Sequence, residues 1–178
     1  MIPLSPGERR GPRRVYANDA IAIDWEPSLC IHTGNCTHGL GEVFDAQARP
    51  WVDVNAADPE RIAATVLTCP TGALHFRRLD DGPPELPATT TTVELRPNGP
   101  LVIRGRVRIV DSDGHLIRED SRLALCRCGA SENKPFCDGS HRRIGVQAAP
   151  GAPGGVRDDR TRPGDTGNET GGSPEPRT

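Results

Sequence analysis

Alternating hydrophobic and polar positions occur in three short segments in the first part of the chain. Residues 21–25, 51–54 and 74–77 place apolar side chains at every second position, which is typical of half-buried strands. His75 occupies a polar position of the third segment, so we expect its side chain to point away from the core. The pattern therefore predicts three strands before residue 80.

Two helices are predicted between these strands. Residues 40–44 have apolar side chains at helical spacing, and a second apolar stripe runs through residues 62–67. Asp58 is a suitable N-cap for the second helix, and Pro59 fits its first position. The resulting order β, α, β, α, β in residues 16–79 predicts a compact α+β module.

A second module, mostly β, is predicted over residues 93–147. Its apolar runs are residues 93–95, 101–103, 107–110, 116–117 and 123–125. Breaker residues separate them, including the hairpin signal at Asp113-Gly114. Residues 80–92 contain three prolines and four threonines without an apolar period, so we expect them to form a linker. The predicted class is α+β, with two small modules.

Composition limits what else the chain can be. Its 178 residues include 20 Gly and 18 Pro, and residues 148–178 have no Leu, Ile or aromatic side chain, so we expect that tail to be disordered. Residues 1–15 are expected to be a flexible N-terminus without the apolar region of a secretion signal. The net charge of -2 argues against nucleic-acid binding, and no apolar run is long enough to span a membrane. We therefore expect a cytoplasmic protein, in which six cysteines are metal ligands or reactive thiols.

Three of these cysteines belong to the first module. Cys30 and Cys36 are separated by five residues, and Cys69 precedes a proline. Three thiolates can hold three corners of a cubane cluster, although a buried cysteine can also be only a small hydrophobic residue. Over residues 18–78 the two runs that contain them resemble the divergent mono-cluster 4Fe-4S ferredoxin-like family. The resemblance implies a 3Fe-4S cluster, or a 4Fe-4S cluster whose fourth iron takes His32, another side chain or solvent.

The second module ends in a denser motif. Cys126 and Cys128, two residues apart in an extended segment, point to the same side and can bind one iron. Cys137 and His141, four residues apart, share a face if a helix begins at Asp138, and can bind a second iron. Three cysteines and a histidine are also a normal ligand set for structural zinc, which stays an alternative.

The spacing C-x-C-x2-S/T-x3-P-x-C-D-G-S-H is present in full over residues 126–141 and resembles the CDGSH iron-sulfur signature. The resemblance implies a 2Fe-2S cluster held by Cys126, Cys128, Cys137 and His141. It also implies a homodimer, but the family includes chains with paired motifs and this chain has one copy, so the oligomeric state stays open. Because a neutral imidazole replaces one thiolate, we expect this cluster to have the higher reduction potential of the two. His141 must be deprotonated to bind iron, so acid should compete with the metal.

No acid/base pair, nucleophile motif or phosphate-binding glycine loop indicates an enzyme. The leading hypothesis is a protein that carries electrons, or a labile cluster, to redox partners or apo-acceptor proteins. The alternatives are a redox, pH or iron sensor or cluster-storage protein, and a zinc-stabilised interaction module.

Overall fold

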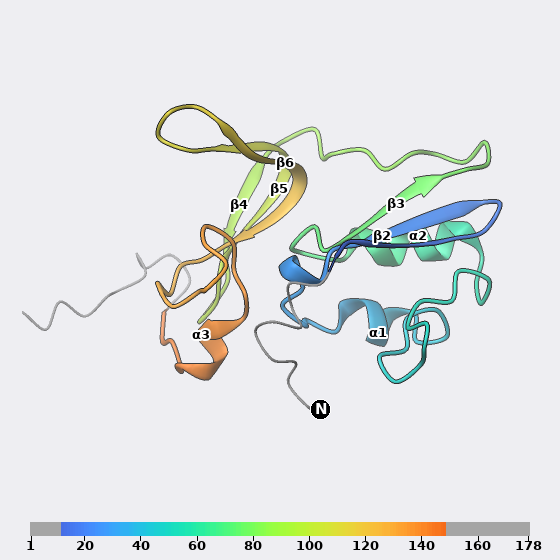
Figure 1. Cartoon of the computed structure of the whole chain (residues 1–178), viewed down its shortest axis with the longest axis horizontal. Helices are drawn as coiled ribbons and strands as arrows, with labels where there is room; N and C mark the ends of the chain where they lie inside the picture. The colour runs from blue at the N-terminus through green and yellow to red at the C-terminus, as the bar shows by residue number, and fades with distance from the viewer. Residues whose placement is uncertain (1–11, 149–178) are drawn as a thin grey trace, which may run out of the picture.

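A computed structural model describes residues 12–148 and contains two three-stranded antiparallel sheets (Figure 1). The elements in chain order are β1 (Arg14–Ala17), β2 (Ile21–Trp25), the 3-10 turn η2 (Pro27–Leu29), α1 (Asn35–Gly39), α2 (Pro59–Leu67), β3 (Leu74–Arg78), β4 (Thr92–Leu95), β5 (Leu101–Val110), β6 (Leu116–Leu125) and α3 (Ser140–Arg143). The expected disordered tail lies outside the described residues except for Ala148, and so do residues 1–11 of the expected flexible N-terminus. The α+β class expected from the sequence is confirmed.

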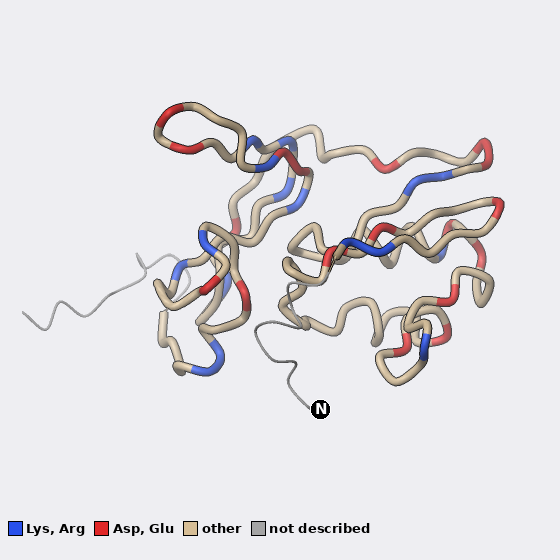
Figure 2. The backbone as a smooth tube through the Cα atoms, viewed as in Figure 1, with Lys and Arg blue, Asp and Glu red and all other residues tan. Residues whose placement is uncertain are grey.

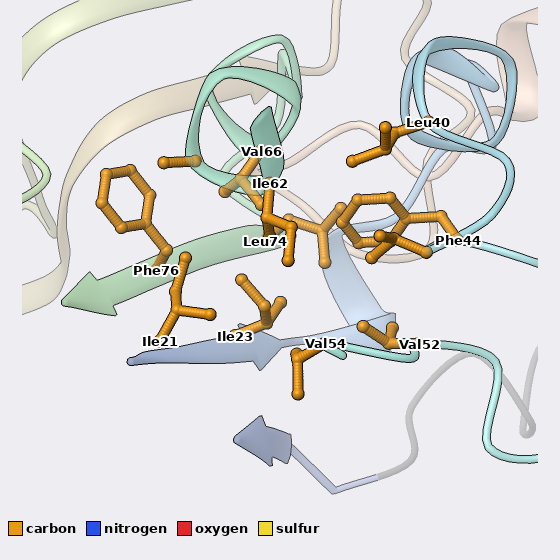
Figure 3. Close-up of a cluster of buried hydrophobic side chains, with 12 residues drawn as sticks. Ile21, Ile23, Leu40, Phe44, Val52, Val54, Ile62, Val66, Leu74 and Phe76 are labelled. Atoms are coloured by element: carbon orange, nitrogen blue, oxygen red, sulfur yellow. The ribbon is translucent and has the colours of Figure 1, made fainter. Parts of the chain in front are cut away.

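The first sheet has the order β1-β2-β3, and α1 and α2 cover one of its faces (Figures 1 and 3). Ile21 and Ile23 in β2 are fully buried on the face that the helices cover, and Ala22 and Asp24 are buried on its opposite face. The core consists of Ile21, Ile23, Leu40, Val43, Phe44, Val52, Val54, Ile62, Ala63, Val66, Leu74 and Phe76. One apolar cluster thus joins the sheet to both helices and to the chain between them.

Two predictions for this module were wrong. Residues 51–54 do not form a strand, because their pairing with the preceding chain is limited to the isolated bridge between Phe44 and Val52. Val52 and Val54 are nevertheless buried, so the alternation reported burial correctly and strand pairing incorrectly. The first helix occupies Asn35–Gly39 instead of residues 40–44, which form a turn that still sends three apolar side chains into the core. The pattern also missed β1, which is an exposed edge strand.

The second sheet has the order β4-β5-β6. Its main unit is the hairpin of β5 and β6, whose connection has Gly114 at a φ of 85° and a hydrogen bond from the Gly114 amide to the Asp111 carbonyl. Val102, Leu123 and Ala124 are buried near the base of this hairpin, where the motif that contains Cys126 begins. Among residues 12–148, no helix has the length and apolar character needed to cross a membrane.

Arg122 of β6 extends from the second sheet into the first module. Its buried guanidinium donates hydrogen bonds to the carbonyls of Val66 and Leu74, the latter at 2.9 Å, and to Glu85 at 2.6 Å. Gly72 packs closely against the Arg122 backbone: a Cβ at Gly72 would lie 2.4 Å from the Arg122 carbonyl oxygen. The two sheets are therefore joined by buried polar contacts.

His75 belongs to the same network, which the sequence analysis did not foresee. Its Nδ1 lies 2.8 Å from Glu85 and its Nε2 lies 3.0 Å from Asp120, and both carboxylates are buried. Burial of the ring opposes protonation, but hydrogen bonds to Asp120 and Glu85 outweigh it and raise the pKa of His75 to about 9. His75 does point away from the first core, as expected, but into the contact between the modules and not into solvent.

Candidate iron-sulfur sites

The first candidate site combines three cysteines from separate segments. Cys30 follows the turn η2, Cys36 lies in the first turn of α1, and Cys69 follows the end of α2. Asn35 donates a hydrogen bond of 2.9 Å to the carbonyl of Thr68, which ties α1 to the end of α2 and thereby brings Cys36 toward Cys69. The fold thus gathers at one end of the two helices the residues that the sequence placed 39 positions apart.

Electrostatics agree with a shared site for these thiols. Burial, followed by the proximity of Cys69 and Cys36, raises the pKa of Cys30 to about 12. Burial and Cys69 also raise the pKa of Cys36. Three thiolates at this location would repel one another, so their ionised form requires bound cations such as the irons of a cluster.

His32 lies within reach of this site. Its Nδ1 is 3.8 Å from the Cys30 Sγ atom, and its backbone has a φ of 54°, which turns the ring back toward the cysteine. His38 packs instead against Gly34, where a Cβ would lie 2.8 Å from the His38 ring. Of the two histidines in this loop, His32 has the position that a ligand beside Cys30 would need.

The second candidate site forms where residues 133–137 fold back on the end of β6. The amide of Cys126 donates to the Pro135 carbonyl at 2.9 Å, and the amide of Cys137 donates to the Ala124 carbonyl at 2.7 Å. An antiparallel bridge between Leu125 and Phe136 completes this pairing. This pairing places residues 135–137 beside residues 124–126.

The four potential ligands of this site form two close pairs. The Sγ atoms of Cys126 and Cys128 are 3.8 Å apart, and the Cys137 Sγ atom is 3.3 Å from the His141 Nδ1 atom. Two ligands on one tetrahedral ion with bonds of about 2.3 Å would be separated by roughly 3.8 Å. Each pair could therefore hold one ion.

The separation between the pairs distinguishes one ion from two. A single zinc ion needs all four ligand atoms close together, but in residues 12–148 the only three ligand groups within 4.8 Å of one another are the exposed Asp111, Asp113 and His115. No three ligand atoms of the motif at residues 126–141 therefore lie within 4.8 Å of one another, so the four side chains do not form one compact set around a single point.

Side chains that are not ligands hold the second loop in shape. Ser131 donates a 2.7 Å hydrogen bond to the Phe136 carbonyl, and Asp138 accepts hydrogen bonds from the amides of Glu132 and Ser140. The predicted helix start at Asp138 was wrong, because α3 begins at Ser140 after Gly139, whose φ of 86° favours glycine. The turn, and not a shared helix face, therefore brings Cys137 to His141.

The ionisation of these residues depends on their burial. Burial raises the pKa of Cys137 to about 11, whereas backbone N–H groups of Ser131 and Gly129 outweigh the effect of burial at Cys126 and lower its pKa. Burial and then the charge of Arg142 lower the pKa of His141, which favours the neutral imidazole required of a metal ligand. Cys126 and Cys128 are half-buried and Cys137 is buried, so one end of the site lies nearer to the surface.

Sequence reasoning missed the residues that connect the two sites to their surroundings. Arg122, Asn133, Arg142 and Asn35 make their contacts with backbone carbonyls far away in the sequence. Surface arginines and asparagines have no pattern that marks such contacts. A cavity of about 400 Å³ between the modules is lined in part by His75 and Glu85, but by none of the potential ligands.

The fold and the two thiol-rich sites define a small iron-sulfur protein with two binding modules. Residues 16–79 match the family of divergent 4Fe-4S mono-cluster domains, and residues 98–142 match the iron-binding zinc finger of CDGSH type. The chain belongs to these two families through its first and second modules, respectively.

Part of the chain is also similar to curated proteins. The uncharacterized protein YjdI of Escherichia coli K12 is 33% identical over 67 residues, which is 38% of this chain and 88% of YjdI. YjdI of Escherichia coli O157:H7 has the same identity and coverage.

Proposed function

We propose that this protein is a cytoplasmic electron carrier with two iron-sulfur clusters. The observation that supports the proposal most strongly is the division of Cys126, Cys128, Cys137 and His141 into two close pairs, as two bridged irons require. A 2Fe-2S cluster there would use all four residues and would supply one-electron redox chemistry.

For the first site we propose Cys30, Cys36 and Cys69 as ligands of a 4Fe-4S or 3Fe-4S cluster. His32 is our proposed fourth ligand in the four-iron case, because its ring nitrogen is 3.8 Å from the Cys30 sulfur. The protein residues hold the cluster, and their burial controls the access of solvent to it.

The charge distribution supports docking to a redox partner. Residues 15–79 contain eight acidic residues and four arginines, and Figure 2 shows acidic positions on the outer loops of the first module. A basic partner surface would associate with these loops by electrostatic attraction, which salt screens over about 10 Å at 0.1 M ionic strength. We therefore propose partner proteins with basic docking surfaces.

Anaerobic purification followed by iron and acid-labile sulfide analysis tests the proposal. The expected result is both elements in amounts that match one two-iron and one three- or four-iron cluster, together with paramagnetic resonance signals of both types after stepwise reduction. Protein that is replete with its natural metal but releases no sulfide would refute an iron-sulfur function and favour a zinc module.

Delivery of a labile cluster is the second candidate function. The half-buried Cys126 and Cys128 support it, because an acceptor thiol can approach that end of the site more easily than the buried Cys137. Transfer of iron and sulfide to an apo-acceptor, without prior loss to a chelator, would favour delivery. Repeated reduction and oxidation without loss of the cluster would favour electron transfer. Loss of the cluster on oxidation alone would favour a sensor.

A further inference from the structure

The loop that carries Cys30 packs against the loop of the second site, although Cys69 and Cys126 are 57 positions apart in the sequence. Ile31, which follows Cys30, is 5% exposed and packs in one buried cluster with Ala124 and Cys137 of the second module. Side chains in such a cluster approach within about 4.5 Å. Ile31, the neighbour of the proposed ligand Cys30 in the sequence, is thus packed in the same apolar cluster as Cys137, a proposed ligand of the second site.

Side chains of the second module donate hydrogen bonds to backbone carbonyls on both sides of Cys30. Arg142, which follows His141, donates from Nη1 to the Ile31 carbonyl at 2.8 Å and to the His32 carbonyl at 3.3 Å. Asn133 donates to the Ser28 carbonyl at 2.9 Å. These part-buried and exposed hydrogen bonds, together with the buried cluster of Ile31, Ala124 and Cys137, hold the Cys30 loop against the CDGSH loop.

We propose that the two sites form an internal electron relay, with Cys30, Ile31 and Cys137 as its path through the protein; this inference rests on the proposed electron-carrier function. With a cluster held by Cys30, Cys36 and Cys69 and another by Cys126, Cys128, Cys137 and His141, one electron would leave the first centre and would reduce one ferric ion of the second to ferrous. No bond forms or breaks, and no atom is transferred. A low-potential one-electron donor protein supplies the electron, and a one-electron acceptor protein removes it.

The chemistry of the ligands gives the relay its direction. His141 replaces a thiolate by a neutral ligand, which makes the second centre less negative and raises its potential above that of an all-thiolate centre. Electron tunnelling weakens exponentially with distance, so a packed apolar contact between the ligand loops favours it over a water-filled gap. The proposed direction, from the first module to the second, also requires the first centre to keep the lower potential when His32 is one of its ligands.

Flash reduction of the full, cluster-loaded chain tests the relay, with photoreduced deazaflavin as the one-electron donor. The expected result is loss of the reduced first centre and gain of the reduced second centre in a single first-order phase. The rate of that phase should not depend on protein concentration. Ile31→Ala should slow it several-fold, and Arg142→Gln should slow it less. Ile144→Ala removes an exposed side chain from the same region and should leave the rate unchanged.

The outcomes separate the relay from the function on which it rests. Absence of sulfide would refute the clusters themselves. If both clusters are present but the phase is missing, or accelerates with protein concentration, the relay is refuted while the carrier function stands. If the phase is present but equally fast in Ile31→Ala and Arg142→Gln, the proposed path is refuted. If Ile31→Ala does not retain both clusters, the concentration dependence in the unmodified protein decides the question. Magnetic broadening between the two reduced centres provides an independent readout.

Discussion

His75 makes the stability of this protein depend on pH in the alkaline range. The ring is held between the buried carboxylates of Glu85 and Asp120, at 2.8 and 3.0 Å, and the side chain is only 26% exposed. Its pKa is about 9 in the folded protein and about 6.5 in an unfolded chain. The charged ring therefore stabilises the fold fully below pH 6.5, and this contribution is lost as the pH rises through 9.

The size of the effect follows from the two pKa values. A difference of about 2.5 units corresponds to roughly 3 kcal/mol of unfolding free energy at 1.36 kcal/mol per unit. At 2–4 °C per kcal/mol, the melting temperature should fall by roughly 6–12 °C between pH 6 and pH 9.5 through this residue.

Thermal unfolding of the anaerobic, cluster-loaded protein between pH 6 and 9.5 measures this dependence. His75→Gln should melt well below the unmodified protein at pH 6.5 and approach it at pH 9.5. Other groups also titrate in this range, so the difference between the two proteins is the quantity that matters. His115→Gln removes an imidazole that is 79% exposed and should follow the unmodified protein throughout. Parallel melting curves for His75→Gln and the unmodified protein would refute the reasoning.

Three further variants test the contact between the modules and the second site. Arg122→Met leaves the buried Glu85 without its arginine partner and should cost about 3–5 kcal/mol of unfolding free energy in urea titrations; a loss below about 1 kcal/mol would contradict the buried ion pair. Gly72→Ala should lower the melting temperature, because the residue has a φ of 69° and the new Cβ would clash with the Arg122 carbonyl; an unchanged value would show that this contact is loose. His141→Cys should retain its visible absorbance at lower pH, since no imidazole is protonated, whereas equal acid loss rates would argue against His141 as a ligand.

The local elements could be predicted where one short-range signal was sufficient. The helix α2 begins at Pro59 after Asp58, as its N-terminal residues indicated, and β2 and β3 follow the period-two alternation. Residues 51–54 show the limit of that signal, because alternation indicates that one side of a segment is buried, whereas a strand also needs a partner of sufficient length. In the same way, the apolar residues of positions 40–44 enter the core from a turn that follows a helix.

The sequence alone identified the candidate ligands of this protein and the two families that its modules match. The spacing of the first three cysteines identified the first candidate site, and the CDGSH motif with its histidine identified the second. The identities of such ligands limit what they can bind. Only the tertiary structure decided how the sites are related: Ile31 and Arg142 lie between them, and Arg122 and His75 bind the modules together. These contacts join residues that are about 40 to 110 positions apart, and an arginine or isoleucine has no local pattern that reveals a distant partner.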